Sequence, residues 1–87
     1  MTAEELSAVL RRALVYRFGI KQAVQDDTAL FSMGLIDSLN VIELVTFVEE
    51  QLGWSVPPRE ITLENFDSVG QILRFASRHA DLLGNEK

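Results

Sequence analysis

The first apolar residues of the chain recur at three- and four-residue steps. This spacing predicts a helix from Leu6 to Phe18 with one buried stripe. Thr2 is followed three residues later by Glu5, a pair that forms a candidate capping box, and Gly19 stands where the helix would end. The predicted stripe consists of Leu6, Val9, Leu10, Ala13, Leu14 and Phe18.

The segment from Gly19 to Asp37 keeps neither a helical nor a strand period, which predicts a long ordered loop. Loops of this length are uncommon inside a small domain and are often functional. We expect its apolar residues to fix it to the core, and its end leads directly into Ser38. The expected anchors are Leu30, Phe31, Leu35 and Ile36.

The pattern predicts a second helix from about Ser38 to Leu52. Gly53 would end it, and the pair Pro57-Pro58 prevents a simple continuation. A short helix fits between Arg59 and Phe66. We expect Thr62 to cap this short helix and Ile61, Leu63 and Phe66 to be its buried contacts.

The last helix is predicted to open at Asp67 or Ser68. Ser68 and Gln71 match a second capping box, and the tail from Gly84 to Lys87 is expected to fray. The residues expected to point inward are Val69, Ile72, Leu73, Ala76 and Ala80. No segment alternates long enough for a sheet, so the expected fold class is an all-α bundle. It would form one domain over residues 1–87, with its core at about residues 2–83 and a short flexible C-terminal tail.

The second predicted helix has two distinct faces at about 100° per residue. Its core stripe is predicted to consist of Val41, Leu44, Val45, Val48 and Leu52. The opposite face consists of Leu39, Ile42, Glu43, Thr46, Glu49 and Glu50. A domain of this size cannot bury a helix on all sides, so the aliphatic residues of this face should meet solvent or a partner.

Composition narrows the classes of partner and site. Thirteen acidic residues against eight basic ones give a net charge of -5, which disfavours nucleic acids and anionic membranes and favours basic protein surfaces. The absence of cysteine excludes disulfides and thiolate metal sites, and no other metal-ligand spacing is recognisable. No apolar run approaches the roughly 20 residues of a membrane span, so we expect a cytoplasmic monomer.

Ser38 places a hydroxyl at the first turn of the second predicted helix. Free backbone N–H groups and the positive end of the helix dipole would favour a phosphate there. Asp and Ser are also common N-cap residues, so the pair Asp37-Ser38 alone needs no function. Two other hypotheses therefore stay open: an acidic helical adaptor in which Ser38 only caps the helix, and a serine that is phosphorylated for regulation.

The segment Asp37-Ser38-Leu39, preceded by Gly34-Leu35, resembles the attachment motif of acyl carrier and peptidyl carrier proteins. The resemblance continues through residues 41–45, Glu49-Glu50 and the entry to the last helix at residues 66–69. It implies a four-helix bundle with a short third helix. It also implies a 4'-phosphopantetheine arm on Ser38, taken from coenzyme A and carrying cargo as a thioester.

The resemblance further implies a protein that catalyses nothing itself. Its partners would be a phosphopantetheinyl transferase, which should need Asp37 and Leu39, an acyl- or aminoacyl-loading enzyme, and downstream synthase or tailoring enzymes. They would dock on the exposed face of the second helix defined above. Asn40 and Thr46 depart from the pattern of fatty-acid carriers, and Pro57-Pro58 favours a stand-alone carrier of a specialised polyketide, nonribosomal peptide or related pathway. The segment Leu35-Ile36-Asp37 lies closer to acyl and D-alanyl carriers than to peptidyl carriers.

The remaining candidates for chemistry are interpreted as structural. His79, the only histidine, is expected to face solvent near a helix end rather than act as a base. Trp54 is expected to cover the edge of the core. The pair Asp26-Asp27 is interpreted as part of a solvated loop, and Arg11, Arg12 and Arg17 as a solvated helix face.

Overall fold

The computed structural model describes residues 1–79, and within them the chain forms four α-helices and no strand. The all-α fold class is therefore confirmed. Two single 3-10 turns, η1 (Ser38–Asn40) and η2 (Pro58–Glu60), accompany the helices. The four helices are α1 (Ala3–Tyr16), α2 (Val41–Leu52), α3 (Leu63–Phe66) and α4 (Val69–Arg78).

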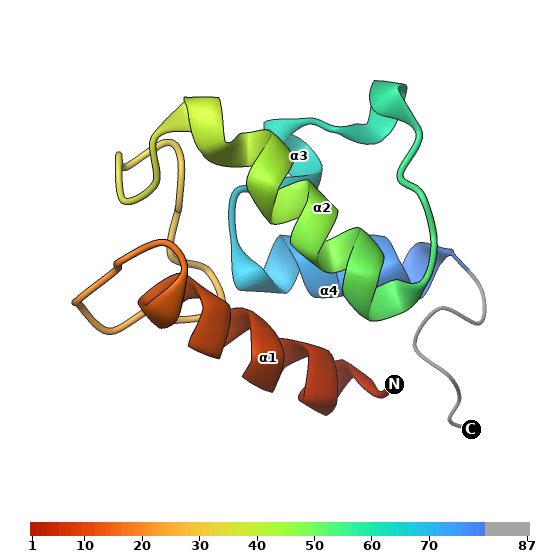
Figure 1. Ribbon diagram of the computed structural model, residues 1–87, viewed down its shortest axis with the longest axis horizontal. Helices are drawn as coiled ribbons and strands as arrows, with labels where there is room; N and C mark the ends of the chain where they lie inside the picture. Colours follow the sequence, from red (N-terminus) through yellow and green to blue (C-terminus); the bar gives the residue numbers. More distant parts are fainter. Residues whose placement is uncertain (80–87) are drawn as a thin grey trace.

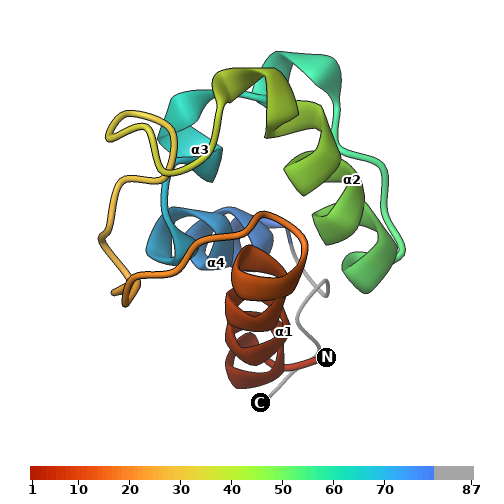
Figure 2. The same ribbon diagram turned by 60° about the vertical axis from the view of Figure 1, so that its left-hand side comes forward.

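Helix α4 lies at the centre of the arrangement. It packs against α1 on one side and against the short α3 on the other (Figure 1). The turned view in Figure 2 shows α2 on the opposite side of the molecule from the long loop that joins α1 to α2. No helix of the described part of the chain is long and apolar enough to cross a membrane.

The capping box at the start of α1 is confirmed. Thr2 Oγ1 accepts from Glu5 N at 3.1 Å, and Glu5 Oε1 accepts from Thr2 N at 2.8 Å. The helix ends earlier than expected, at Tyr16. Gly19 then adopts a positive φ of 71°, which reverses the chain so that Ile20 N donates to Leu14 O at 2.9 Å. Phe18 is half-buried beyond the helix end.

The core confirms most of the expected apolar contacts and adds two that the expected stripes omitted. Phe47 is 8% exposed on the flank of α2, and Phe75 is fully buried on α4. Phe75 packs on Phe66 with their ring centroids 5.2 Å apart. Both additions are large aromatic rings, which reach the core from positions beside the predicted stripes. Ala80 and the tail expected to fray lie outside the described residues.

The short helix α3 corrects two expectations. Thr62 stands at its N-cap but makes no capping hydrogen bond through its side chain. Leu63, expected to be buried, is 50% exposed, whereas Phe66 is fully buried and Ile61 half-buried. A single helical turn can turn only one residue fully inward, and Phe66 takes that position.

The start of α4 resembles a capping box but is not reciprocal. Ser68 Oγ accepts from Gln71 N at 3.1 Å, as expected. The side chain of Gln71 instead accepts from Asp67 N at 2.9 Å, one residue before the cap. The carboxylate of Asp67 bonds the long loop, at Phe31 and Ser32.

Candidate functional site

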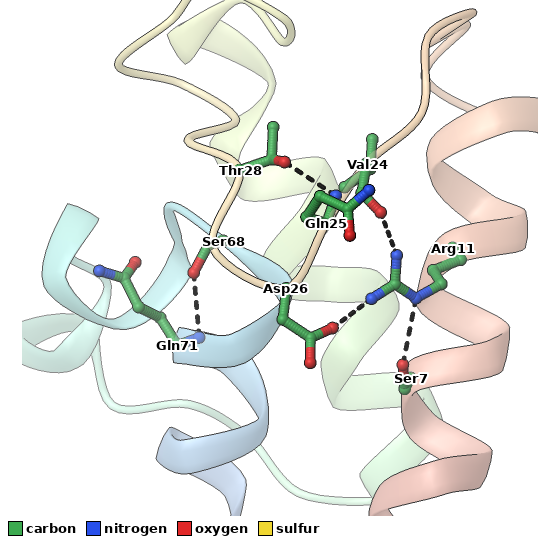
Figure 3. A network of polar contacts seen from close by, with 8 residues as sticks. All are labelled: Ser7, Arg11, Val24, Gln25, Asp26, Thr28, Ser68 and Gln71. Carbon is green, nitrogen blue, oxygen red and sulfur yellow. Dashed lines mark hydrogen bonds and ion pairs between the residues drawn. The ribbon is translucent and has the colours of Figure 1, made fainter.

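The long loop is fixed to α1 by Arg11, which the sequence analysis had assigned to a solvated face. Its guanidinium donates to the backbone oxygen of Val24 and to the carboxylate of Asp26, and Nε donates to Ser7 Oγ at 3.3 Å (Figure 3). The backbone oxygen of Asp26 also accepts from Gly70 N at 2.8 Å. The first half of the loop is thereby tied to α1 and α4, so Asp26 and Arg11 are structural contacts.

The second half of the loop is fixed by Asp67, which sequence reasoning considered only as a helix start. Its carboxylate accepts from Phe31 N at 2.7 Å, Ser32 N at 3.1 Å and Ser32 Oγ at 2.6 Å. The backbone oxygen of Asp67 accepts from Leu30 N at 2.6 Å. Leu30 O in turn accepts from Ile36 N at 2.9 Å. These bonds close the loop just before the Asp37-Ser38 pair.

The electrostatics of Asp67 follow from these contacts. Partial burial pushes the pKa of the carboxyl upward, but hydrogen bonds from the Ser32 hydroxyl and from the backbone of Phe31 and Ser32 outweigh it. The pKa of Asp67 therefore lies below its ordinary value. The carboxylate stays charged while it holds the loop.

The buried residues of the loop confirm the expected apolar anchors. Leu30 is fully buried, Phe31 is 9% exposed and Ile36 is 3% exposed, while Leu35 is half-buried. Apolar anchoring and the Asp67 bonds together set where the chain enters α2. The segment that carries Ser38 is thus presented by a fixed loop.

Ser38 is the first residue of η1, immediately before α2. Asp37 is the N-cap: its Oδ1 accepts from Leu39 N at 2.9 Å, and its backbone oxygen accepts from Asn40 N at 2.8 Å. The N–H groups of Leu39 and Asn40 are therefore satisfied by Asp37, which corrects the expectation that they point freely toward a group on Ser38. Of the features expected to favour a phosphate on Ser38, the positive end of the α2 helix dipole remains.

The hydroxyl of Ser38 takes no part in the hydrogen bonds that hold the described residues together. Ser38 is exposed, and no hydrogen bond of the described residues involves its Oγ. Asp37, not Ser38, supplies the side-chain cap. An exposed hydroxyl without a partner can accept a long covalent arm without breaking a native contact, so the residues present fit 4'-phosphopantetheine.

The exposed face of α2 continues directly from this hydroxyl. Leu39, in η1, is 85% exposed, and Ile42, in the first turn of α2, is 58% exposed. The face also exposes Glu43, Thr46 and Glu50. Glu49 differs, because it is half-buried and its Oε2 accepts from Val56 N at 2.8 Å. Its carboxylate fixes the turn after α2, a role beyond the helix that the helical period could not indicate.

Two further apolar side chains are exposed, of which Met33 was not singled out from the sequence and Leu63 was expected to be buried. Met33, in the loop that precedes Ser38, is 73% exposed, and Leu63 of α3 is 50% exposed. A burial pattern alone could not have found them, since Leu63 was expected to be buried. They add to the aliphatic surface that the described chain leaves open.

His79 is half-buried and in contact with neighbouring side chains, which corrects the expectation that it simply faces solvent. Its Nε2 lies 2.9 Å from Glu60 Oε1, and its ring lies 4.6 Å from the ring of Trp54 and 4.7 Å from that of Phe75. Trp54 packs at the core edge, as expected. The end of α4 and the start of α2 lie at opposite ends of the molecule (Figure 1). The structure thus pairs His79 with Glu60 and places it against two aromatic rings.

Comparison with known proteins decides the family. Residues 5–76 match the family described as phosphopantetheine attachment site, or PP-binding. The chain belongs to this carrier-protein family. Proteins of the family bear a 4'-phosphopantetheine prosthetic group, and as carriers they meet phosphopantetheinyl transferases and acyl-loading or synthase enzymes. The acyl or peptidyl carrier resemblance is thereby confirmed.

Two relatives of this carrier domain are informative. A protein of Streptomyces lincolnensis described as lincomycin biosynthesis protein LmbN is 37% identical over 78 residues, which are 88% of this chain and 27% of the relative. The chain thus spans about a quarter of that relative's length. A D-alanyl carrier protein of Abiotrophia defectiva is 30% identical over 57 residues, which are 66% of this chain and 72% of the relative. No solved structure matches the chain significantly.

Proposed function

We propose that Ser38 carries the 4'-phosphopantetheine arm and that this carrier serves a specialised biosynthetic pathway. The observation that carries the proposal is the Ser38 hydroxyl itself: it is exposed, it has no partner in the described residues, and it directly follows the capping residue Asp37. When attached, the arm supplies a terminal thiol, which holds an acyl or aminoacyl group as a thioester in a chain without cysteine.

The chain's own residues position and present the attachment point. Asp67 and the buried residues of the loop fix the segment before α2, and Asp37 fixes the first turn. We assign no catalytic step to the described residues, because His79 is engaged with Glu60. Bond making and breaking belong to the separate transferase, loading and downstream enzymes.

The exposed face of α2 is proposed to dock these enzymes. Leu39 and Ile42 offer aliphatic contact beside Ser38, while Glu43 and Glu50 offer charge that attracts basic surfaces and guides encounter. Thr46 lies between them along the helix. Glu49 is proposed to support this surface indirectly, because its carboxylate accepts a hydrogen bond from Val56 N and so fixes the turn after α2. Such a surface suits brief contacts with several partners in turn.

The specialised pathway is supported by the relatives rather than by the site. One relative is described as a lincomycin biosynthesis protein and another as a D-alanyl carrier protein. The departures at Asn40 and Thr46 from the fatty-acid pattern point in the same direction. The cargo group is set by the enzyme that loads the arm.

The proposal is tested by intact-protein mass spectrometry after incubation with coenzyme A, Mg²⁺ and a broad-specificity phosphopantetheinyl transferase. We expect the wild-type mass to rise by one phosphopantetheine, and Ser38→Ala to show no increase. Ser55→Ala is the matched control, because Ser55 is also exposed and should leave loading intact. An unchanged mass in folded wild-type protein, with several transferases, would favour the acidic adaptor.

A further inference from the structure

A cavity of about 380 Å³ opens where α1 faces the second half of α2. Its apolar lining comes from Val9, Ala13 and Phe47. Its polar lining comes from Arg12, Tyr16, Arg17 and Gln51. The volume lies near the lower end of the range of about 300–1,000 Å³ that is typical of ligand sites, but this cavity is a shallow groove that is largely open to solvent, a shape that suits a docked segment.

The charge of this cavity is opposite to that of the protein as a whole. The chain carries a net charge of -5, yet no carboxylate lines the cavity while two guanidinium groups do. Arg12 and Arg17 are exposed, and neither forms an ion pair among residues 1–79. A planar guanidinium donates two parallel hydrogen bonds to a carboxylate, so the cavity matches an acidic ligand.

The side chains around the opening have the character of an interface. Tyr16 is 84% exposed and the neighbouring Val15 is 49% exposed. Arg17 Cζ lies 5.2 Å from the ring centroid of Phe47, within reach of a cation–π contact with this apolar residue of the lining. Tyrosine and arginine are enriched among the residues that supply most of the binding energy of interfaces. Tyr16, which lines the cavity together with both arginines, is therefore a candidate contact.

We propose that this cavity docks an acidic segment of a partner protein. One apolar side chain of that segment would enter between Val9, Ala13 and Phe47, and flanking carboxylates would pair with Arg12 and Arg17. The acidic face of α2, with Glu43 and Glu50, suits basic surfaces instead. The two surfaces would select partners of opposite charge.

The test uses a hexapeptide with a central leucine and phenylalanine flanked by two glutamates on each side, acetylated and amidated at its ends. Its neutral match has glutamines in place of the glutamates. Backbone amide shifts of ¹⁵N-labelled Ser38→Ala protein are followed by NMR at low ionic strength. The Ser38→Ala background keeps the result independent of phosphopantetheine loading, so failure of one proposal does not count as failure of the other.

We expect the acidic peptide to shift amides of residues 9–17 and Phe47, and the glutamine peptide to shift them much less. Arg12→Gln with Arg17→Gln should weaken binding by about fivefold, since two charge pairs are lost. The control is Arg59→Gln with Arg74→Gln, two exposed arginines outside the cavity with the same change in charge. It should bind nearly as well as the parent.

Three outcomes would overturn the proposal. The first is shifts that fall elsewhere on the protein or are absent. The second is equal weakening by the two arginine pairs, which would show attraction without a site. The third is concentration-dependent shifts of the cavity residues before any peptide is added, which would assign the cavity to a second copy of this chain.

Discussion

The carboxylate of Asp67 accepts a hydrogen bond at 2.7 Å from the backbone N–H of Phe31, 36 residues earlier in the chain. The same carboxylate bonds both the N–H and the hydroxyl of Ser32. Asp67 lies between α3 and α4, so this one side chain links the junction of these two helices to the loop that precedes Ser38. The geometry of the attachment point thus depends on a residue far from it in sequence.

Asp67→Ala should destabilise the fold by about 1–3 kcal/mol, because it leaves the partly buried Phe31 N–H without its acceptor. Chemical denaturation measures this change. Asp27→Ala is a matched control, since Asp27 is exposed and its change should stay within about 0.5 kcal/mol. Equal effects of the two substitutions would contradict the anchoring role of Asp67.

The stability contribution of Asp67 should depend on pH in a defined direction. Its pKa in the folded state lies below the ordinary value of 3.8, so the unfolded chain takes up the proton first as pH falls. The contribution is fully present above the unfolded pKa and is lost as pH falls through the folded pKa. Denaturation between about pH 6 and pH 2 should show a steeper loss for wild type than for Asp67→Asn. Parallel curves would contradict this assignment.

Asp37→Ala should cost about 1 kcal/mol of stability, within a typical range of roughly 0.5–2 kcal/mol, because the Leu39 N–H loses its cap. Ser38→Ala should change stability by less than about 0.5 kcal/mol, since no hydrogen bond of the described residues involves its hydroxyl. The two substitutions are compared by thermal unfolding. A larger loss for Ser38→Ala than for Asp37→Ala would reassign the cap.

Glu49 and Glu50 are adjacent acidic residues of α2 with different expected roles. Glu49→Ala should lose about 1–3 kcal/mol, since Val56 N would be left without its partner. Glu50→Ala, at an exposed position, should stay within about 0.5 kcal/mol. Urea unfolding of both variants measures the two changes in stability. It distinguishes a carboxylate that stabilises the fold from one that is available for docking. Equal stabilities would remove the structural role of Glu49.

The docking role of the exposed α2 face predicts an effect on rate rather than stability. Glu43→Lys with Glu50→Lys should lower kcat/KM of the transferase about tenfold at low ionic strength, with a smaller effect at high salt. The control Glu4→Lys with Asp27→Lys makes the same change in charge at exposed positions away from α2. If the control slowed loading as much, net charge rather than this face would govern encounter.

Local sequence patterns predicted the existence and order of the helices, but not the bonding of the N–H groups beside Ser38, which Asp37 satisfies. The step pattern from Leu6 onward and the Thr2–Glu5 capping box concern residues within a few turns of each other, and both are found in the structure. Gly53 ends α2 in a left-handed conformation, as its position indicated. The apolar anchors of the loop were also visible as a run of large side chains.

Contacts between distant segments could not be predicted in this way. Arg11 pairs with Asp26, and Asp67 with Phe31, without any period that relates their positions. The helical wheel also missed Phe47 and Phe75, whose rings reach the core from the flanks of their helices. His79 was assigned to solvent because its neighbours Glu60 and Trp54 come from another segment. The burial and contacts of these residues depend on how far each side chain reaches and on which distant residue it meets.

The most direct test of the carrier assignment is localisation of the modification by fragmentation mass spectrometry. Trypsin cuts after Lys21 and Arg59 but nowhere between them, so one peptide, residues 22–59, contains Ser38 together with Ser32 and Ser55. In protein loaded from coenzyme A, our account predicts 4'-phosphopantetheine on Ser38 alone. Attachment to Ser32 or Ser55, or a bare phosphate on Ser38 in protein isolated from its source, would contradict it.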